Sequence, residues 1–109
     1  MKIAVITHNE IEGFHRWPDA PEYLGYLRER HRHVFVIECL FRVTKEDRQT
    51  EIITKQHEID EYMWDNYGRP AEFHDFSCET IAKRIIDFWP DCVSCTVRED
   101  GFGGAVVTR

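Results

Sequence analysis

The chain has 109 residues, enough for one domain with a core between about two layers of helices and strands. Twenty acidic residues against fourteen basic ones give a net charge of -6, which argues against a nucleic-acid or anionic-membrane surface. No apolar run approaches the roughly 18 residues that span a bilayer, and the start does not resemble a signal peptide. We therefore expect a cytoplasmic protein whose partners are small molecules or other protein chains.

The cysteine spacing predicts no disulfide framework, so Cys39, Cys78, Cys92 and Cys95 are expected to be reduced. Cys92 and Cys95 have CxxC spacing, but they fall on an expected strand, where residues three apart face opposite sides. Two small buried hydrophobes are therefore favoured over a zinc ribbon or a redox motif.

The first part of the chain is expected to form one strand and then an irregular segment. Residues 2–7 are rich in β-branched side chains, and this strand can continue towards His15. Two prolines and an aspartate within residues 17–21 interrupt regular structure. The pattern over residues 23–30 fits either a short helix or an ordered loop.

Residues 31–44 form the strongest strand in the sequence. Alternation places seven side chains on one face: His31, His33, Phe35, Ile37, Cys39, Phe41 and Val43. The other face carries Val34, Val36 and Leu40 between charged residues. A strand in a two-layer monomer has one wet face, so the second apolar face suggests a cover, such as another subunit.

Two helices and a hairpin are expected in the second half. Apolar residues recur at helical spacing over residues 52–65, and a second helix is expected from the N-cap Ser77 to Pro90. Residues 92–98 and 105–108 read as the two strands of a hairpin.

This order predicts a single α+β domain over residues 1–109. The ββααββ order is arranged most simply as two hairpins in one four-stranded antiparallel sheet, with an antiparallel helix pair on one face.

Three histidines are candidate metal ligands. His31 and His33 project from the same face of their strand, and an antiparallel neighbour would bring His15 beside them. Three neutral imidazoles leave a tetrahedral zinc ion one open position, as in catalytic sites.

Two points about these histidines stay open. Glu58, Glu79 or a backbone carbonyl could orient the second ring nitrogen of a ligand. The competing interpretation of residues 28–33 is a solvated basic cluster that enters a strand.

Four short motifs occur in an order that resembles one known family. Residues 13–17, 27–33, 76–82 and 97–99 read Gly-Phe-His-Arg-Trp, Leu-Arg-Glu-Arg-His-Arg-His, Phe-Ser-Cys-Glu-Thr-Ile-Ala and Val-Arg-Glu. They are similar to the first histidine motif, the His-Gly-His, the Pro-Thr-Ser-Glu-Asn-Leu-Ala and the Val-x-Glu of the 6-pyruvoyl-tetrahydropterin and 6-carboxy-tetrahydropterin synthases. The likeness spans nearly the whole chain.

The resemblance implies a tunnelling-fold subunit. Sheets of several subunits would join into a barrel, with helices outside and sites between subunits, in a homo-oligomer such as a trimer or hexamer. It also implies zinc on His15, His31 and His33, and a pterin anchored by Glu99. A carboxylate accepts two parallel hydrogen bonds from the amidine edge of a pterin- or guanine-like ring. Without the resemblance, Glu99 would be interpreted as an ordinary carboxylate at a hairpin end.

Two proton-transfer positions of the family are changed in this chain. The family has a catalytic cysteine where this chain has Leu27, and an Asp-His pair where it has Asp65 and Asn66. Neither a leucine nor an amide transfers protons. Asp65 remains a catalytic candidate, and His74 or His57 could replace the missing base.

Other motif positions concern the substrate. Cys78 and Glu79, in the third motif, are candidates for substrate binding beside Glu99. Arg32 replaces the glycine of His-Gly-His, and this cation could bind a phosphate or point to solvent.

Two functions of different classes follow. The first is a zinc-dependent lyase acting on dihydroneopterin triphosphate or a related pterin, in pterin or 7-deazaguanine (queuosine) biosynthesis. The second is a binding protein that keeps the metal and Glu99 and takes a pterin- or purine-like molecule without turning it over. Loss of both proton-transfer groups weakens the first, and the retained histidines weaken a third, purely structural role.

Overall fold

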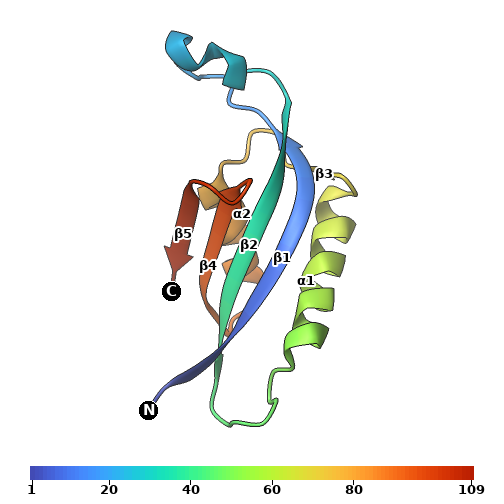
Figure 1. The fold of residues 1–109 in the computed structure, drawn as a ribbon, viewed down its shortest axis with the longest axis vertical. Coiled ribbons are helices and arrows are strands. Elements are labelled where there is room, and N and C mark those ends of the chain that lie inside the picture. Colours follow the sequence, from blue (N-terminus) through green and yellow to red (C-terminus); the bar gives the residue numbers. More distant parts are fainter.

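The computed structural model describes all 109 residues, and Figure 1 shows a twisted sheet with helices packed against it. The elements are β1 (Ile3–His15), the 3-10 helix η1 (Glu22–Leu27), β2 (His31–Val43), α1 (Ile52–Tyr67), β3 (Ala71–Glu72), α2 (Cys78–Phe88), β4 (Cys92–Glu99) and β5 (Gly104–Thr108). The predicted α+β class is confirmed. No helix is both long enough and apolar enough to cross a membrane.

The sheet differs from the expected four-stranded antiparallel one. It has five strands in the order β3-β1-β2-β4-β5, and it is mixed because β3 pairs in parallel with β1 at Gly13 and Phe14. A strand of two residues leaves no alternation in a sequence, so the expected ββααββ order omits β3. The expected order also lacks η1, where the pattern allowed a helix or a loop. The sheet of a single chain is open and does not close into a barrel.

β1 and β2 form a long antiparallel pair that positions the histidines. Each strand has 13 residues, and their register runs from Ile3 opposite Val43 to His15 opposite His31. Directly opposed side chains lie on the same face of a sheet, and His33 lies two residues further along β2. All three histidines therefore gather at one end of one face.

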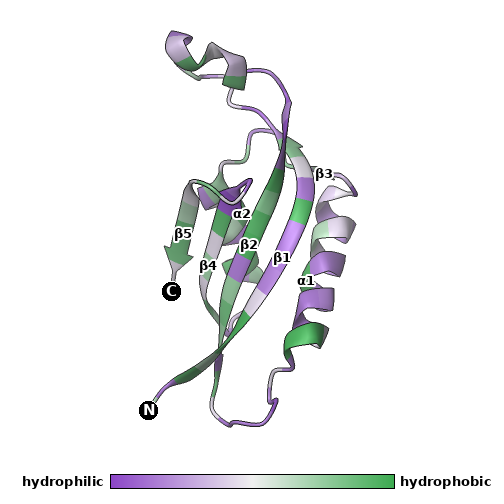
Figure 2. Cartoon of the chain, in the orientation of Figure 1, coloured by the Kyte–Doolittle hydropathy of each residue, from purple (hydrophilic) through white to green (hydrophobic).

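The helix-covered face of the sheet forms the core. Phe35, Ile37, Cys39 and Phe41 are completely buried, which confirms the alternation predicted for β2. They belong to one cluster with residues of both helices: Ile59, Met63, Ile81, Ala82, Ile85 and Ile86. Figure 2 shows the contrast between β2, coloured mostly hydrophobic, and α1, which is mostly hydrophilic because only a narrow stripe of it reaches the core.

The opposite face of the sheet is partly apolar and uncovered in a single chain. Ile6 is 56% exposed and Val106 is 60% exposed, while Val36 and Leu40 are half-buried. The expected cover by another subunit stays a prediction.

A register shift between Leu40 and Phe41 puts Cys92 and Cys95 on the same side of β4. The pairing skips Val93, because the partners of Leu40 and Phe41 lie two residues apart on β4. The expectation that the two cysteines face opposite sides is therefore wrong. Their burial is confirmed, since neither has exposed surface, and every cysteine in the chain is a free thiol.

Both long helices begin at capping side chains. Ser77 Oγ accepts a hydrogen bond from Thr80 N at 3.3 Å, as predicted for this N-cap. Glu51 caps α1 by accepting from Ile53 N and Thr54 N, both at 2.9 Å. The Ser77 cap fixes where α2 begins, next to the histidine end of the sheet.

Gly13 lies opposite His33 in the pairing of β1 with β2. Its lack of a side chain allows β1, β3 and the core to approach one another there. A Cβ at this position would lie 2.8 Å from Phe73 Cε2 and 3.2 Å from Ala71 O. Phe73 is completely buried and its ring centroid lies 4.9 Å from that of Phe35. A methyl group here therefore forces the ring or β3 to move.

We expect Gly13→Ala to lower the free energy of unfolding by about 1–3 kcal/mol, as overpacking does. Gly103→Ala is the matched control, because its Cβ would meet no atom within 4 Å. The control should stay within about 0.5 kcal/mol of the parent. Urea denaturation followed by tryptophan fluorescence measures both changes, and equal effects would contradict the close packing at Gly13.

Candidate functional site

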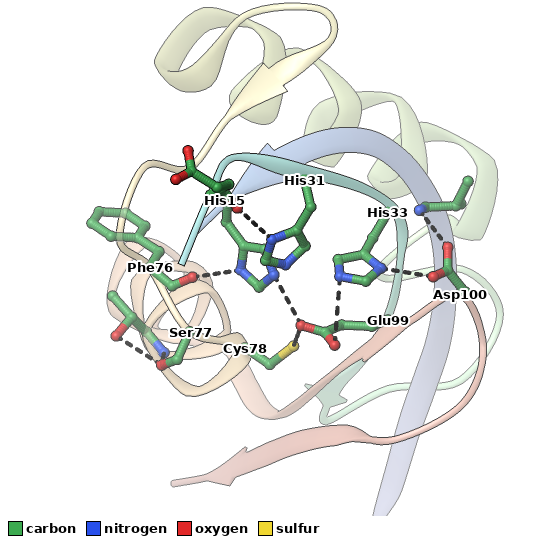
Figure 3. Close-up of polar contacts among 11 residues, drawn as sticks. His15, His31, His33, Phe76, Ser77, Cys78, Glu99 and Asp100 are labelled. Carbon is green, nitrogen blue, oxygen red and sulfur yellow. Dashed lines mark hydrogen bonds and ion pairs between the residues drawn. The ribbon is translucent and has the colours of Figure 1, made fainter. Parts of the chain in front are cut away.

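A cavity of about 750 Å³ opens where β1 ends and β2 begins. Its wall combines the ends of β1 and β4, the first residues of β2 and α2, and the turn between β4 and β5. Figure 3 shows the three histidines pointing toward one another in this region, with Glu99 beside them. Segments distant in sequence thus meet around one small volume.

The three imidazoles come from the paired ends of β1 and β2. Their ring centroids are 4.6 Å apart for His15 and His31, 5.2 Å for His15 and His33, and 4.9 Å for His31 and His33. One ligand nitrogen from each lies within 4.8 Å of the other two. They are close enough to bind a metal ion, as the sequence predicted.

Two of the imidazoles use Nδ1 to contact the backbone. His15 Nδ1 lies 2.9 Å from Phe76 O, and His31 Nδ1 lies 2.8 Å from Glu29 O. A carbonyl oxygen only accepts hydrogen bonds, so each Nδ1 carries a proton and donates it. In a neutral ring this leaves the Nε2 lone pair available to a metal ion. Of the orienting groups considered from sequence, the backbone carbonyl is the one found here.

Asp100 is the partner of the third imidazole. His33 Nδ1 donates to Asp100 Oδ2 at 2.7 Å, and Val34 N donates to Asp100 Oδ1 at 2.8 Å. These hydrogen bonds, that from Val34 first, hold the pKa of the Asp100 carboxyl below its usual value. Sequence reasoning considered Glu58 and Glu79 for this role and missed Asp100, whose position depends on a turn rather than on a strand pattern.

Glu99 brings a carboxylate to the open side of the histidine cluster. Its Oε2 lies 3.1 Å from His15 Nε2 and its Oε1 lies 3.7 Å from His33 Nε2 (Figure 3). Glu99 pairs with Phe35 of β2, so its side chain shares the face of the histidines. An imidazole protonated only at Nδ1 would turn a lone pair toward this carboxylate, which is repulsive. A cation between them, either a proton or a metal ion, removes the repulsion.

Two observations fit a metal ion better than a proton. Desolvation lowers the pKa of His15 from its ordinary value of 6.5, which favours the neutral ring. His33 Nε2 is buried without a hydrogen-bond partner, because 3.7 Å to Glu99 is too long for one. A metal ion held by the three Nε2 atoms would give His33 Nε2 a partner.

The start of α2 supplies another wall of the cavity, with Ser77, Cys78 and Glu79 among its lining residues. Cys78 Sγ lies 3.9 Å from Glu99 Oε2. Burial, and then the nearby carboxylates, raise the pKa of the Cys78 thiol to about 12, so it is a thiol rather than a thiolate near neutral pH. The structure therefore brings all three substrate-binding candidates, Cys78, Glu79 and Glu99, into the cavity wall.

The structure shows where two residues that depart from the family pattern, Leu27 and Arg32, are located. Leu27, where the family has its cysteine, lines the cavity and gives it an apolar side chain. Arg32 projects from the other face of β2, where its Nε donates to Glu12 Oε2 at 2.6 Å, and it does not line the cavity. Of its two alternatives, the outward orientation is the one observed.

The predicted catalytic residues Asp65 and His74 are not brought into the cavity with the histidines. Both are exposed and neither lines the cavity. Asp65 is on α1, whereas His74 follows β3 and its carbonyl accepts from Arg16 N at 2.8 Å. His57 is likewise an exposed residue of α1 outside the cavity. The proton-transfer role of these residues stays a prediction without geometric support in a single chain.

Two aromatic residues of the cavity mouth were not among the predicted site residues. Trp17 is 46% exposed and Phe102 is 83% exposed, and both line the cavity. Trp17 is the last residue of the first motif, residues 13–17, and Phe102 lies three residues beyond Glu99.

No protein-family model matches this chain, and no curated protein matches it. The cavity and its side chains are therefore the basis for assigning a function.

We expect Asp100→Asn to weaken zinc binding about 10- to 100-fold, because an amide holds the Nδ1 proton of His33 less strongly than a carboxylate does. Competition with a chromophoric chelator measures the affinity. Asp75→Asn is the matched control, since Asp75 also lines the cavity but binds Arg16 at 2.8 Å and no histidine. An unchanged affinity in Asp100→Asn would contradict the positioning role.

Proposed function

We propose that the chain is a divergent member of the 6-pyruvoyl- and 6-carboxy-tetrahydropterin synthase family. It holds zinc on His15, His31 and His33 and binds a pterin- or purine-like ring against Glu99. The observation that carries this proposal is the convergence of three imidazole nitrogens and one carboxylate in a single cavity. Three imidazole ligands with one open side are typical of catalytic zinc rather than structural zinc.

Zinc bound there would supply a Lewis acid that polarises a ligand oxygen and makes neighbouring protons more acidic. The chain's own residues do the remaining work of positioning. Asp100 and the carbonyls of Glu29 and Phe76 hold the three imidazoles in orientation. The apolar side chains of Leu27 and Trp17 limit the access of water to the ligand.

Metal loading and ring binding are coupled through Glu99. His15 Nε2 cannot both ligate a metal ion and share a proton with Glu99. Occupation of His15 Nε2 therefore leaves the Glu99 carboxylate free to accept two hydrogen bonds from a ligand with an amidine edge.

A zinc-dependent lyase is the second candidate, and Cys78 is the observation that favours it. A thiol lies in the cavity wall although the family's cysteine position is Leu27. With a pKa of about 12, Cys78 stays protonated near neutral pH and is a weak acid, so its pKa is poorly matched to proton transfer there. Ring binding thus has more support than turnover of dihydroneopterin triphosphate or a related pterin.

The oligomeric part of the proposal is a trimer or hexamer in which several sheets join into one barrel. The uncovered face with Ile6 and Val106 supports it. So do the open edges of the sheet, because β5 pairs only with β4 and β1 is paired on its outer edge only at Gly13 and Phe14. Unpaired edges and exposed apolar surface are typical of surfaces that associate.

Zinc-loaded protein should bind dihydroneopterin, and Glu99→Gln should weaken binding about 10- to 100-fold, because a charge-assisted hydrogen-bond pair is lost. Isothermal titration calorimetry measures the affinity. Glu12→Gln is a suitable control, because Glu12 lies on the opposite face of the sheet and binds Arg32. Metal-free protein should bind more weakly than zinc-loaded protein.

Product analysis after incubation of zinc-loaded protein with dihydroneopterin triphosphate separates the two candidates. Recovery of unchanged pterin supports a binding protein, whereas release of triphosphate or loss of side-chain carbons that disappears in Cys78→Ala supports the lyase. Absence of binding by any pterin or purine would refute the proposed function.

Light scattering should give a mass several times the 13.0 kDa of one chain. Ile6→Lys should reduce this mass, because it places a charge on the uncovered sheet face. Ile53→Lys is the control, since Ile53 is also exposed but lies on α1. A monomeric parent protein would contradict the barrel.

A further inference from the structure

The part of the cavity wall that one chain supplies has a charge unfavourable for a polyphosphate. Arg16 is the only lining residue with a fixed positive charge, whereas Asp75, Glu79, Glu99 and Asp100 are acidic. One positive and four negative side chains leave a formal charge of -3 when the histidines are neutral. A divalent metal ion reduces this to -1 but does not reverse it, and the whole chain carries -6.

Arg16 is paired with an acidic residue of the same wall. Its Nε donates to Asp75 Oδ1 at 2.8 Å, so a carboxylate of the same cavity already neutralises it.

Other arginines near the histidine motifs are engaged outside the cavity. Arg28 Nε donates to Ala20 O at 2.8 Å, Arg30 is paired with Glu72, and Arg32 is paired with Glu12. None of these arginines lines the cavity.

Apart from the bound metal ion, the feature of the wall that favours an anion is the N-terminus of α2, and its positive potential is offset locally. Glu79 places a carboxylate in the first turn, where it interacts with the helix dipole. Thr80 N is one of the first-turn amides that have no backbone acceptor within the helix, and it donates to Ser77 Oγ instead. The helix start therefore has little positive potential left for an external phosphate.

The remaining wall suits a flat, uncharged ring. Trp17, Leu27, Phe76 and Phe102 give the cavity apolar and aromatic surface. Aromatic side chains stack on planar heterocycles, and Glu99 supplies the polar contact that would fix the orientation of the ring.

We infer that the ligand of this site is a pterin- or purine-like compound without phosphate groups, an inference that rests on the proposed function. The ring and its short hydroxylated side chain occupy the cavity, and a triphosphate on that side chain is repelled by the acidic wall.

The test compares dihydroneopterin with dihydroneopterin triphosphate, which differ only in the phosphate chain. Calorimetry on zinc-loaded protein at low ionic strength should show binding of the triphosphate at least about tenfold weaker. The difference should shrink as salt is added, because salt screens exposed charges. Zinc content measured after each titration shows whether the triphosphate has removed the metal.

A pair of charge reversals tests whether the difference in affinity between the two ligands arises in the cavity. Asp75→Lys frees Arg16 and adds a positive charge to the wall, so it should narrow the gap between the two ligands several-fold. Glu46→Lys changes the net charge equally from the exposed turn between β2 and α1 and should leave the gap unchanged. The inference would be overturned if neither salt nor Asp75→Lys changed the difference in affinity between the two ligands.

The remaining outcomes separate this inference from the proposed function. Equal affinity for the two ligands overturns the inference and leaves the proposed function intact. Binding of neither ligand overturns both.

Discussion

Three imidazole lone pairs and a carboxylate that face one small space repel one another unless a cation lies among them. The Nδ1 atoms of His15 and His31 donate to carbonyl oxygens, and that of His33 donates to Asp100, so the three Nε2 atoms are left to face inward. Glu99 closes the group at 3.1 Å from the nearest of them. The three imidazoles are close enough to bind a metal ion, and the surrounding elements hold them in this arrangement.

Different elements of the fold supply different parts of the site. The pairing of β1 with β2 sets the spacing of the imidazoles, because His15 and His31 are opposed in a 13-residue register. β4 adds Glu99 from the other side of β2. α2 begins beside the cavity and contributes a neutral thiol, Cys78. The three imidazoles and the other polar groups of the cavity, Glu99 and Cys78, thus come from different elements.

Parts of this arrangement follow from periodicity and are visible in the sequence. The position of the histidines on one face of β2 needs only the two-residue repeat of a strand, and the Ser77 cap needs only local hydrogen bonding. The chain-wide order of motifs led to Glu99, whose structural reason is its pairing opposite Phe35. Other parts depend on features without a repeat. β3 is too short to alternate, the skipped Val93 turns Cys92 inward, and Asp100 reaches His33 only through a turn with positive φ.

That turn also explains where the chain can change length. Asp100 has φ 56° and Gly101 has φ 79°, and Asp100 N donates to Val34 O while its carboxylate holds His33. One added or deleted residue between β4 and β5 would pull Asp100 away from β2 and rotate Glu99 relative to the imidazoles. The turn over residues 45–50 follows the other end of β2 and does not line the cavity. Related chains are therefore expected to tolerate insertions at the β2–α1 turn and to keep the length of the β4–β5 turn.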